Sequence, residues 1–394
     1  MKVLTKISPP NMINIWIYIV IISIIARFLV WTFAIFYPIP NETGLLISPI
    51  LPNSGIDLNF YLSETIKYKN YLLSIYNYIF SSSLTYVTND PNFSDVPISP
   101  GPIFPVILII SNFINYPWVL SFLYLLISSY LIYISIKWLN KKNIHWFWLL
   151  SFGGLPVPFW YMLNISPDLI FSLVVTLYIF VITDTRDTIN KHIYYLLILC
   201  FLSILLKPNG ISLFIFSSYF ILFNYSFNRI LLVFIIFTFI ILSIGFIYFY
   251  GNYLISYILS SNEHRTFFGY YQKEYFIGIY DFLPKIVDQL FSIISLAIIK
   301  LIYFSGIRPT YGDTLNLFII IRSSAGLIIF PGIIWLFIKA NNNIRIFTII
   351  FLIPIMLGLA QERYSIPIYP LLYYYGVLFY SNSFKSIYNI AKFN

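Results

Sequence analysis

The sequence predicts an all-α polytopic membrane protein, built as a single bundle of about 10–12 transmembrane helices. Hydrophobic residues make up 59% of the 394 residues and charged residues only 9%, whereas soluble domains carry roughly 25% charged residues. Apolar runs of about 17–25 residues alternate with short polar breaks, which is the pattern of membrane-spanning helices. A membrane β-barrel would instead show segments of about ten residues with strict alternation, which this sequence lacks. One domain over residues 1–394 is therefore expected.

The first long apolar run, Ile13–Tyr37, predicts a transmembrane helix that remains part of the chain. It follows Lys2 and Lys6 and contains no small-residue cleavage site, so we interpret it as a retained signal anchor with a cytoplasmic N-terminus. Residues 38–102 then form a first outer loop that is broken by Pro, Asn and Ser. Amphipathic pieces of this loop, such as YLSETIKYKNYLLSIYNYIF, can lie flat on the membrane surface.

Further apolar runs predict the remaining spans in chain order. They are Trp118–Trp138, Trp146–Leu163, Leu169–Ile182, Tyr194–Leu206, Ile211–Phe223, Ile230–Tyr250, Leu317–Ile338, Ile346–Leu359 and Ile366–Tyr380. Basic residues gather in the loops WLNKKN, DTRDTINKH, FNR and KANNNIR and in the C-terminal tail. Placing these segments inside satisfies the positive-inside rule and puts both termini in the cytoplasm.

Two apolar runs have no fixed place in this order. Ile103–Ile114 is too short to span and is interpreted as an interfacial or re-entrant helix. Ile286–Phe304 lies in a second outer loop, residues 251–316, and is long enough to be either re-entrant or spanning. If it spans alone, the C-terminus moves outside, so about ten or twelve spans fit the loop charges better than eleven.

Several functional classes are excluded or disfavoured by what the sequence lacks. The net charge of +9 is spread over loops without a basic cluster, so nucleic acid is not an expected partner, whereas membrane lipids are. A single cysteine, Cys200, excludes an intramolecular disulfide. The three histidines lack the spacing of metal ligands, and there is no nucleotide-binding GxxxxGK[ST] loop, no GxSxG elbow and no HExxH.

Ionisable residues are costly at membrane depth, so each one invites a functional hypothesis. Under the topology above, most of the unusual ones collect at the outer ends of the spans. They are Asp57, Glu64, Asp168, Lys207, Arg265, Arg308 and Arg363. Such a gathering is what a polar site facing outward would need.

Each of these residues also has a purely structural interpretation. An acid in an outer loop, such as Asp57, is often simply solvated. Asp168 follows a proline at the start of a span, where a carboxylate complements the helix dipole. Lys207 and Arg363 are at helix ends, where their long side chains can extend to lipid headgroups.

Taken in order, five short segments resemble the GT-C superfamily of polytopic glycosyltransferases, which use sugars linked to polyprenyl phosphate. The nearest resemblance is to bacterial relatives of protein O-mannosyltransferase and of the lipid A aminoarabinose transferase. The segments are GIDLNFY, VPISPGPIFPVILI, SPDLIFSL, LLKPNG and QERYSIPIYPLLYYY. The family's proline-rich segment often carries a basic residue, whereas Ser99, Pro100, Gly101 and Pro102 stand at this place here.

The resemblance implies a GT-C-like helical bundle and an inverting sugar transfer at the outer face. Asp57 would be the catalytic general base that deprotonates the acceptor hydroxyl. The donor phosphate would be bound by cations, with Arg363 as the first choice. Its expected helpers are Lys207, Arg265 and Arg308. The residues expected to orient the acceptor or a metal are Asp168, Tyr61 and Tyr364, and the need for a divalent metal stays open.

The expected setting is the bacterial inner membrane, with a multi-pass chain whose site faces outward. The expected partners are a polyprenyl-phosphate-linked sugar and a lipid, glycan or protein acceptor. Two alternatives stay open: a transporter or flippase of lipid-linked saccharides, and a membrane polysaccharide polymerase or ligase. A transporter would place ionisable residues near the bilayer midplane and show internal repeats.

Overall fold

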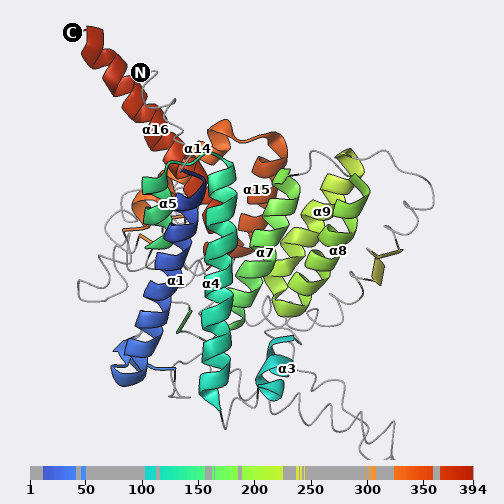
Figure 1. The fold of residues 1–394 in the computed structure, drawn as a ribbon. Coiled ribbons are helices and arrows are strands. Elements are labelled where there is room, and N and C mark those ends of the chain that lie inside the picture. The colour runs from blue at the N-terminus through green and yellow to red at the C-terminus, as the bar shows by residue number, and fades with distance from the viewer. Residues whose placement is uncertain are drawn as a thin grey trace, which may run out of the picture.

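The structure, a computed structural model, describes most of the predicted spans and is almost entirely helical over them (Figure 1). The described residues are 12–40, 46–49, 103–111, 116–155, 162–163, 165–184, 189–224, 324–357 and 364–393, with a few isolated positions between 237 and 307. The predicted spans Ile230–Tyr250 and Ile286–Phe304 therefore lie almost wholly outside the described residues. So does most of each predicted outer loop.

Helices α1, Met12–Phe36, and α4, Pro117–Lys141, are each 25 residues long. At 1.5 Å per residue each measures about 37 Å, more than the roughly 30 Å of a bilayer's hydrocarbon core. Among the described residues these two helices are long and apolar enough to cross a membrane. Pro117 starts α4, where its missing N–H costs nothing. Asn143 adopts a φ of 59° just after α4 ends, as is common for Asn beyond a helix C-terminus.

The other helices follow the predicted order of apolar runs. They are α3 Ile103–Ile110, α5 Trp146–Gly153, α7 Pro167–Asp184, α8 Ile189–Leu206, η3 Pro208–Gly210, α9 Ile211–Asn224, α14 Gly326–Lys339, α15 Asn342–Leu357, η5 Ile366–Ile368 and α16 Tyr369–Phe393. With eight residues, α3 is about 12 Å long, and the prediction that this run is too short to span is confirmed.

Three boundaries differ from the prediction. A continuous helix over Trp146–Leu163 is wrong, because α5 ends at Gly153 and is capped at Gly154. Helix α16 continues past the expected end at Tyr380 to Phe393. The first outer loop opens with a short hairpin of β1, Ile39–Pro40, and β2, Leu46–Ile47. The predicted interfacial helices of this loop, which start beyond it, lie outside the described residues.

Helices α4 and α7 run side by side in the same direction. Tyr124, near the start of α4, donates a hydrogen bond to the carbonyl of Ser166, just before α7. Trp138, near the end of α4, donates one to Thr183, near the end of α7. The start of α7 therefore lies at the same end of the bundle as the start of α4, opposite the end that carries Lys141.

Aromatic packing joins α7, α9 and α15 in the core. The rings of Tyr178, Phe216 and Phe347 contact one another with centroid separations of 5.2–6.3 Å. All three side chains are buried. Helices α14 and α16 approach closely because Gly332 and Gly376 face the opposing backbone, where a Cβ would lie 2.1 and 2.2 Å from carbonyl oxygens.

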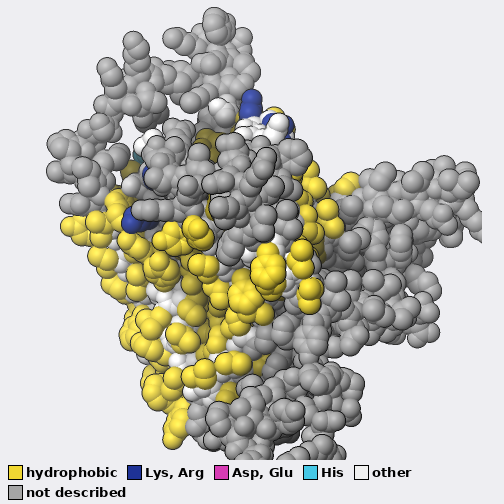
Figure 2. All heavy atoms as spheres, turned by 90° about the vertical axis from the view of Figure 1, so that its right-hand side faces the viewer, with side chains coloured by type: hydrophobic (Ala, Val, Ile, Leu, Met, Phe, Trp, Pro, Cys, Tyr) yellow, Lys and Arg dark blue, Asp and Glu magenta, His cyan; other side chains and the backbone are white. Residues whose placement is uncertain are grey.

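Large apolar side chains cover much of the outside of the molecule. On α1 and α4 alone, Tyr18, Ile22, Leu29, Trp118 and Leu126 are among those more than half exposed. Figure 2 shows a broad hydrophobic face over the bundle, with the visible Lys and Arg atoms toward its upper end. Soluble monomers rarely expose apolar patches larger than a few hundred Å². The described structure is thus consistent with an α-helical membrane protein.

Candidate functional site

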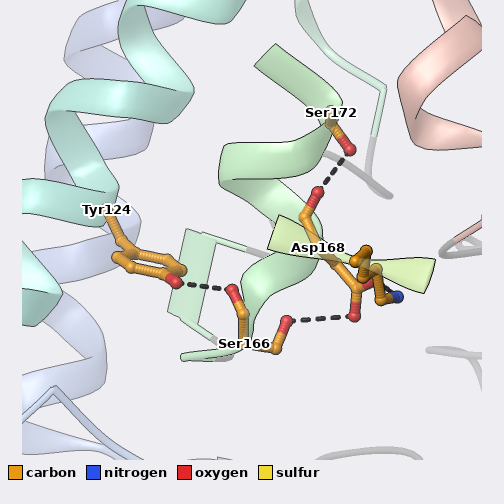
Figure 3. Close-up of polar contacts among 5 residues, drawn as sticks. Tyr124, Ser166, Asp168 and Ser172 are labelled. Atoms are coloured by element: carbon orange, nitrogen blue, oxygen red, sulfur yellow. Dashed lines mark hydrogen bonds and ion pairs between the residues drawn. The ribbon is translucent and has the colours of Figure 1, made fainter. Parts of the chain in front are cut away.

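The start of α7 holds a buried carboxylate. Pro167 is the first residue of the helix and Asp168 lies in its first turn, where a negative charge is stabilised by the helix dipole. The Asp168 side chain is only 3% exposed. Its Oδ2 accepts a hydrogen bond from Ser166 Oγ at 3.1 Å, and the Ser172 hydroxyl donates to its backbone carbonyl at 2.6 Å (Figure 3).

The turn between α8 and α9 presents Lys207 to this carboxylate. Helix α8 ends at Leu206, since Pro208 cannot continue its hydrogen bonding. Gly210 lies so close to the preceding helix that a Cβ would be 2.3 Å from the carbonyl carbon of Ser203. The Pro and Gly of the LLKPNG segment therefore shape a tight turn with Lys207 at its start.

The Lys207 ammonium forms an ion pair with Asp168 Oδ1. The lysine side chain is 12% exposed, and its Nζ lies 4.7 Å from the centroid of the Tyr364 ring, in cation–π geometry. The structural interpretation that Lys207 only extends to headgroups is wrong, because the ammonium is held inside the bundle by Asp168. Asp168 in turn both complements the helix dipole and neutralises Lys207.

Neighbouring helices hold the three residues in place. Tyr124 of α4 is fully buried, and its hydroxyl donates to the Ser166 carbonyl at 2.5 Å. Thr176 of α7 donates to the carbonyl of Pro367 in η5 at 3.1 Å. Because η5 begins two residues after Tyr364, this bond fixes the C-terminal segment against α7 and places the ring near Lys207.

The cluster holds a nearly buried pair of opposite charges. A buried ion pair is tolerated only when its partners are well satisfied, as the hydroxyl of Ser166 and the ring of Tyr364 achieve here. The ammonium has three N–H donors, so pairing with one carboxylate oxygen uses part of its capacity. Within the described ranges no group of three or more His, Cys, Asp or Glu side chains gathers as a metal site would require.

The structure thus brings together three of the residues that were predicted for the site: Asp168, Lys207 and Tyr364. The other predicted residues lie outside the described residues. They are Asp57, Tyr61, Arg265, Arg308 and Arg363.

One buried cation was missed by the sequence reasoning. Arg27 lies in the middle of α1 and its side chain is fully buried. Its Nε donates to Ser128 Oγ at 3.2 Å, and its Nη1 donates to the carbonyls of Ser23 at 3.1 Å and Gly153 at 3.2 Å. The signal was present, because an arginine within a spanning segment is a functional hypothesis by default.

Comparison with models of known protein families, with curated proteins and with solved structures gives no match to this chain in any of the three. The function proposed for the site therefore rests on its own geometry and on the short sequence segments that meet there. SPDLIFSL contributes Asp168 to the cluster, LLKPNG contributes Lys207, and QERYSIPIYPLLYYY contributes Tyr364.

Proposed function

We propose that this chain is an integral-membrane glycosyltransferase of the GT-C type, with about 10–12 spans in a bacterial inner membrane. It moves a sugar from a polyprenyl-phosphate donor to a lipid, glycan or protein acceptor at the extracytoplasmic face. The observation that carries this proposal is the meeting of Asp168, Lys207 and Tyr364 at the end of the bundle opposite Lys141. All three lie in segments of the chain that resemble this superfamily.

The proposed reaction is a single inverting displacement at the anomeric carbon. The acceptor oxygen forms a bond to that carbon while the bond to the phosphate oxygen breaks and its electron pair leaves with the phosphate. Asp57 takes the proton of the acceptor hydroxyl, a general-base effect worth about 10²–10⁴-fold. Cations stabilise the leaving phosphate, with Arg363 and Lys207 in that role and Arg265 and Arg308 assisting.

The Asp168 carboxylate gives Lys207 a defined position before any donor binds. A lysine ammonium on a flexible stem would otherwise sample many positions, whereas the ion pair and the Tyr364 ring hold it at one place. A donor phosphate can then share the ammonium with Asp168, which stays as an acceptor-orienting group. Tyr61 and Tyr364 offer aromatic faces to the sugar.

A transporter or flippase of lipid-linked saccharides is the second candidate, and Arg27 is the observation that favours it. Transporters place ionisable residues and interrupted helices near the bilayer midplane, and Arg27 lies mid-helix beside the end of the short α5. However, its side chain is fully enclosed and bonded to two backbone carbonyls and a serine. These contacts hold α1 against α4 and α5, which is a packing role and not that of a residue along a substrate path.

A proteoliposome assay with a radiolabelled polyprenyl-phosphate sugar separates the two candidates. A transferase moves the label onto a new acceptor and releases polyprenyl phosphate, whereas a flippase carries the label across the bilayer with its phosphate bond intact. We expect Lys207→Met to lower the transfer rate by about 10²–10³-fold, the usual loss when one electrostatic donor is removed from a site.

Two matched variants complete this test. Lys207→Arg keeps a cation and should retain part of the transfer activity, while Lys137→Gln removes an exposed lysine of α4 far from the cluster and should leave transfer unchanged. Intact donor appearing on the far side of the bilayer, with no new glycosidic bond, would overturn the transferase proposal.

A further inference from the structure

The corner where α14 passes into α15 is strongly basic. Lys339 is the last residue of α14 and is exposed, while Arg345 lies at the start of α15 and is partly buried. From Thr314 to Gln361 the sequence contains neither Asp nor Glu. The corner therefore has two cations and no acid on either of its own helices, and it lies at the upper end of the bundle in Figure 1.

Hydrogen bonds hold this corner in one shape. Arg345 Nη2 donates to the carbonyl of Ile338 at 2.9 Å, which satisfies a free acceptor at the end of α14. Asn341 Oδ1 accepts from the backbone N–H of Ile344 at 2.9 Å and so caps the start of α15. Lys339 Nζ lies 5.5 Å from the ring centroid of Trp335, one turn earlier in α14.

Apolar side chains continue from the corner along both helices. On α14 the exposed side chains are Ile334, Phe337 and Ile338, and on α15 they are Ile349 and Ile353. Trp335 is partly buried and packs edge-to-face against Phe379 of α16. The apolar surface next to Lys339 is therefore formed by its exposed neighbours Phe337 and Ile338.

We propose that this corner is a binding site for an anionic phospholipid. The lipid phosphate lies between Lys339 and Arg345, and its acyl chains follow the exposed faces of α14 and α15. The chemistry is complementary, because the guanidinium and ammonium recognise phosphate and the surface next to them is apolar. The site is separate from the Asp168–Lys207–Tyr364 cluster and does not depend on sugar transfer.

Quenching of tryptophan fluorescence by brominated lipids tests the site. The chain has eight tryptophans, so the contribution of Trp335 is taken as the difference between the wild-type protein and Trp335→Phe. The full-length protein is reconstituted in phosphatidylcholine bilayers that contain equal fractions of either dibrominated phosphatidylglycerol or dibrominated phosphatidylcholine. We expect the Trp335 contribution to be quenched more strongly by the anionic lipid than by phosphatidylcholine, so the excess should be larger in the wild-type protein than in Trp335→Phe.

Charge variants assign the excess to the corner. Lys339→Gln should lower the preference for the anionic lipid about fivefold, as expected for one cation near a headgroup, and Lys339→Arg should keep it. Among the described residues Lys339 makes no hydrogen bond to the corner, so we expect its replacement to leave the fold intact. Adding Arg345→Gln should remove the remaining preference. Lys137→Gln is the matched control. Lys137 also lies over an aromatic ring one helical turn earlier, with its Nζ 5.6 Å from the ring centroid of Tyr133, and its replacement should leave the lipid preference unchanged.

Equal quenching by both lipids in the wild-type protein, or an unchanged excess in Lys339→Gln, would overturn the proposal.

Discussion

At the scale of single residues, Asp168 and Lys207 form an ion pair that offsets the desolvation cost of placing each charge in an apolar bundle. Either charge alone would carry a desolvation penalty of several kcal/mol. As a pair, with Ser166 bonded to the carboxylate and the Tyr364 ring against the ammonium, they hold a polar cluster inside a hydrophobic body. The pair thus lets two charges remain inside the bundle.

We expect Asp168→Asn and Lys207→Met each to destabilise the protein by up to about 3 kcal/mol, because each removes the opposite charge that faces its buried partner. The double variant should be less destabilised than the sum of the two, since it leaves no charge behind. Thermal unfolding of the purified protein in detergent measures the three values. Strictly additive losses would show that the two side chains do not interact.

The sequence predicts a residue of this kind when its chain neighbours mark it, and not when its contacts come from distant parts of the chain. Asp168 and Lys207 could be identified because Ser-Pro-Asp and Lys-Pro-Asn-Gly mark helix boundaries, where charges stand out. Their pairing could not be derived, because it depends on α7 and α8 lying antiparallel. Arg27 carried a signal of its own as a cation within a spanning segment. Its partners Ser128 and Gly153 could not be predicted, because they are more than 100 residues away.

At the scale of elements, glycines decide where helices end and how closely they pack. The apolar run after Trp146 predicts one long helix, but α5 stops after eight residues at a Gly-Gly pair, and Arg27 supplies a donor to the carbonyl of Gly153. Hydropathy alone cannot show such an interruption, because the residues on both sides are equally apolar. The break could have been predicted from Gly153, Gly154, Pro156 and Pro158, since glycine and proline interrupt helices.

The packing of α14 against α16 gives a test at this scale. We expect Gly332→Ala and Gly376→Ala each to lower the thermal midpoint clearly, because the new methyl group would meet the backbone carbonyls of Leu372 and Ile328 at 2.1 and 2.2 Å. Backbone atoms cannot turn aside as a flexible side chain can, so the two helices must move apart. Such overpacking typically costs about 1–3 kcal/mol.

Gly154→Ala is the matched control, since a Cβ there would meet its nearest neighbour at an ordinary 3.6 Å and the backbone φ of −90° suits alanine. A midpoint for Gly332→Ala equal to that of Gly154→Ala would contradict the close approach of α14 and α16.

At the scale of the whole molecule, charge and chemistry are divided between the two ends of the bundle. The end of α4 carries Lys141 and Lys142, and the α14–α15 corner carries Lys339 and Arg345. The candidate site lies at the other end, beside the start of α4. The positive-inside rule places the basic end in the cytoplasm, so the site faces outward under the proposed topology.

Single-cysteine labelling tests this arrangement in intact cells. In a Cys200→Ser background, Tyr116→Cys should react with a membrane-impermeant maleimide from outside, because Tyr116 is exposed just before the start of α4. Asn143→Cys, just after the end of α4, and Asn342→Cys, at the start of α15, should react only after the membrane is permeabilised. Labelling of positions 116 and 143 from the same side would contradict a spanning α4.

The proposed sugar transfer depends on Asp57 as its general base. The most direct measurement is the transfer rate of purified Asp57→Asn in proteoliposomes with a polyprenyl-phosphate sugar, beside Glu64→Gln as the matched loss of an acid from the same loop. We expect Asp57→Asn to lose transfer by about 10²–10⁴-fold, while insertion and expression stay normal and Glu64→Gln remains active. Full transfer activity in Asp57→Asn would contradict it.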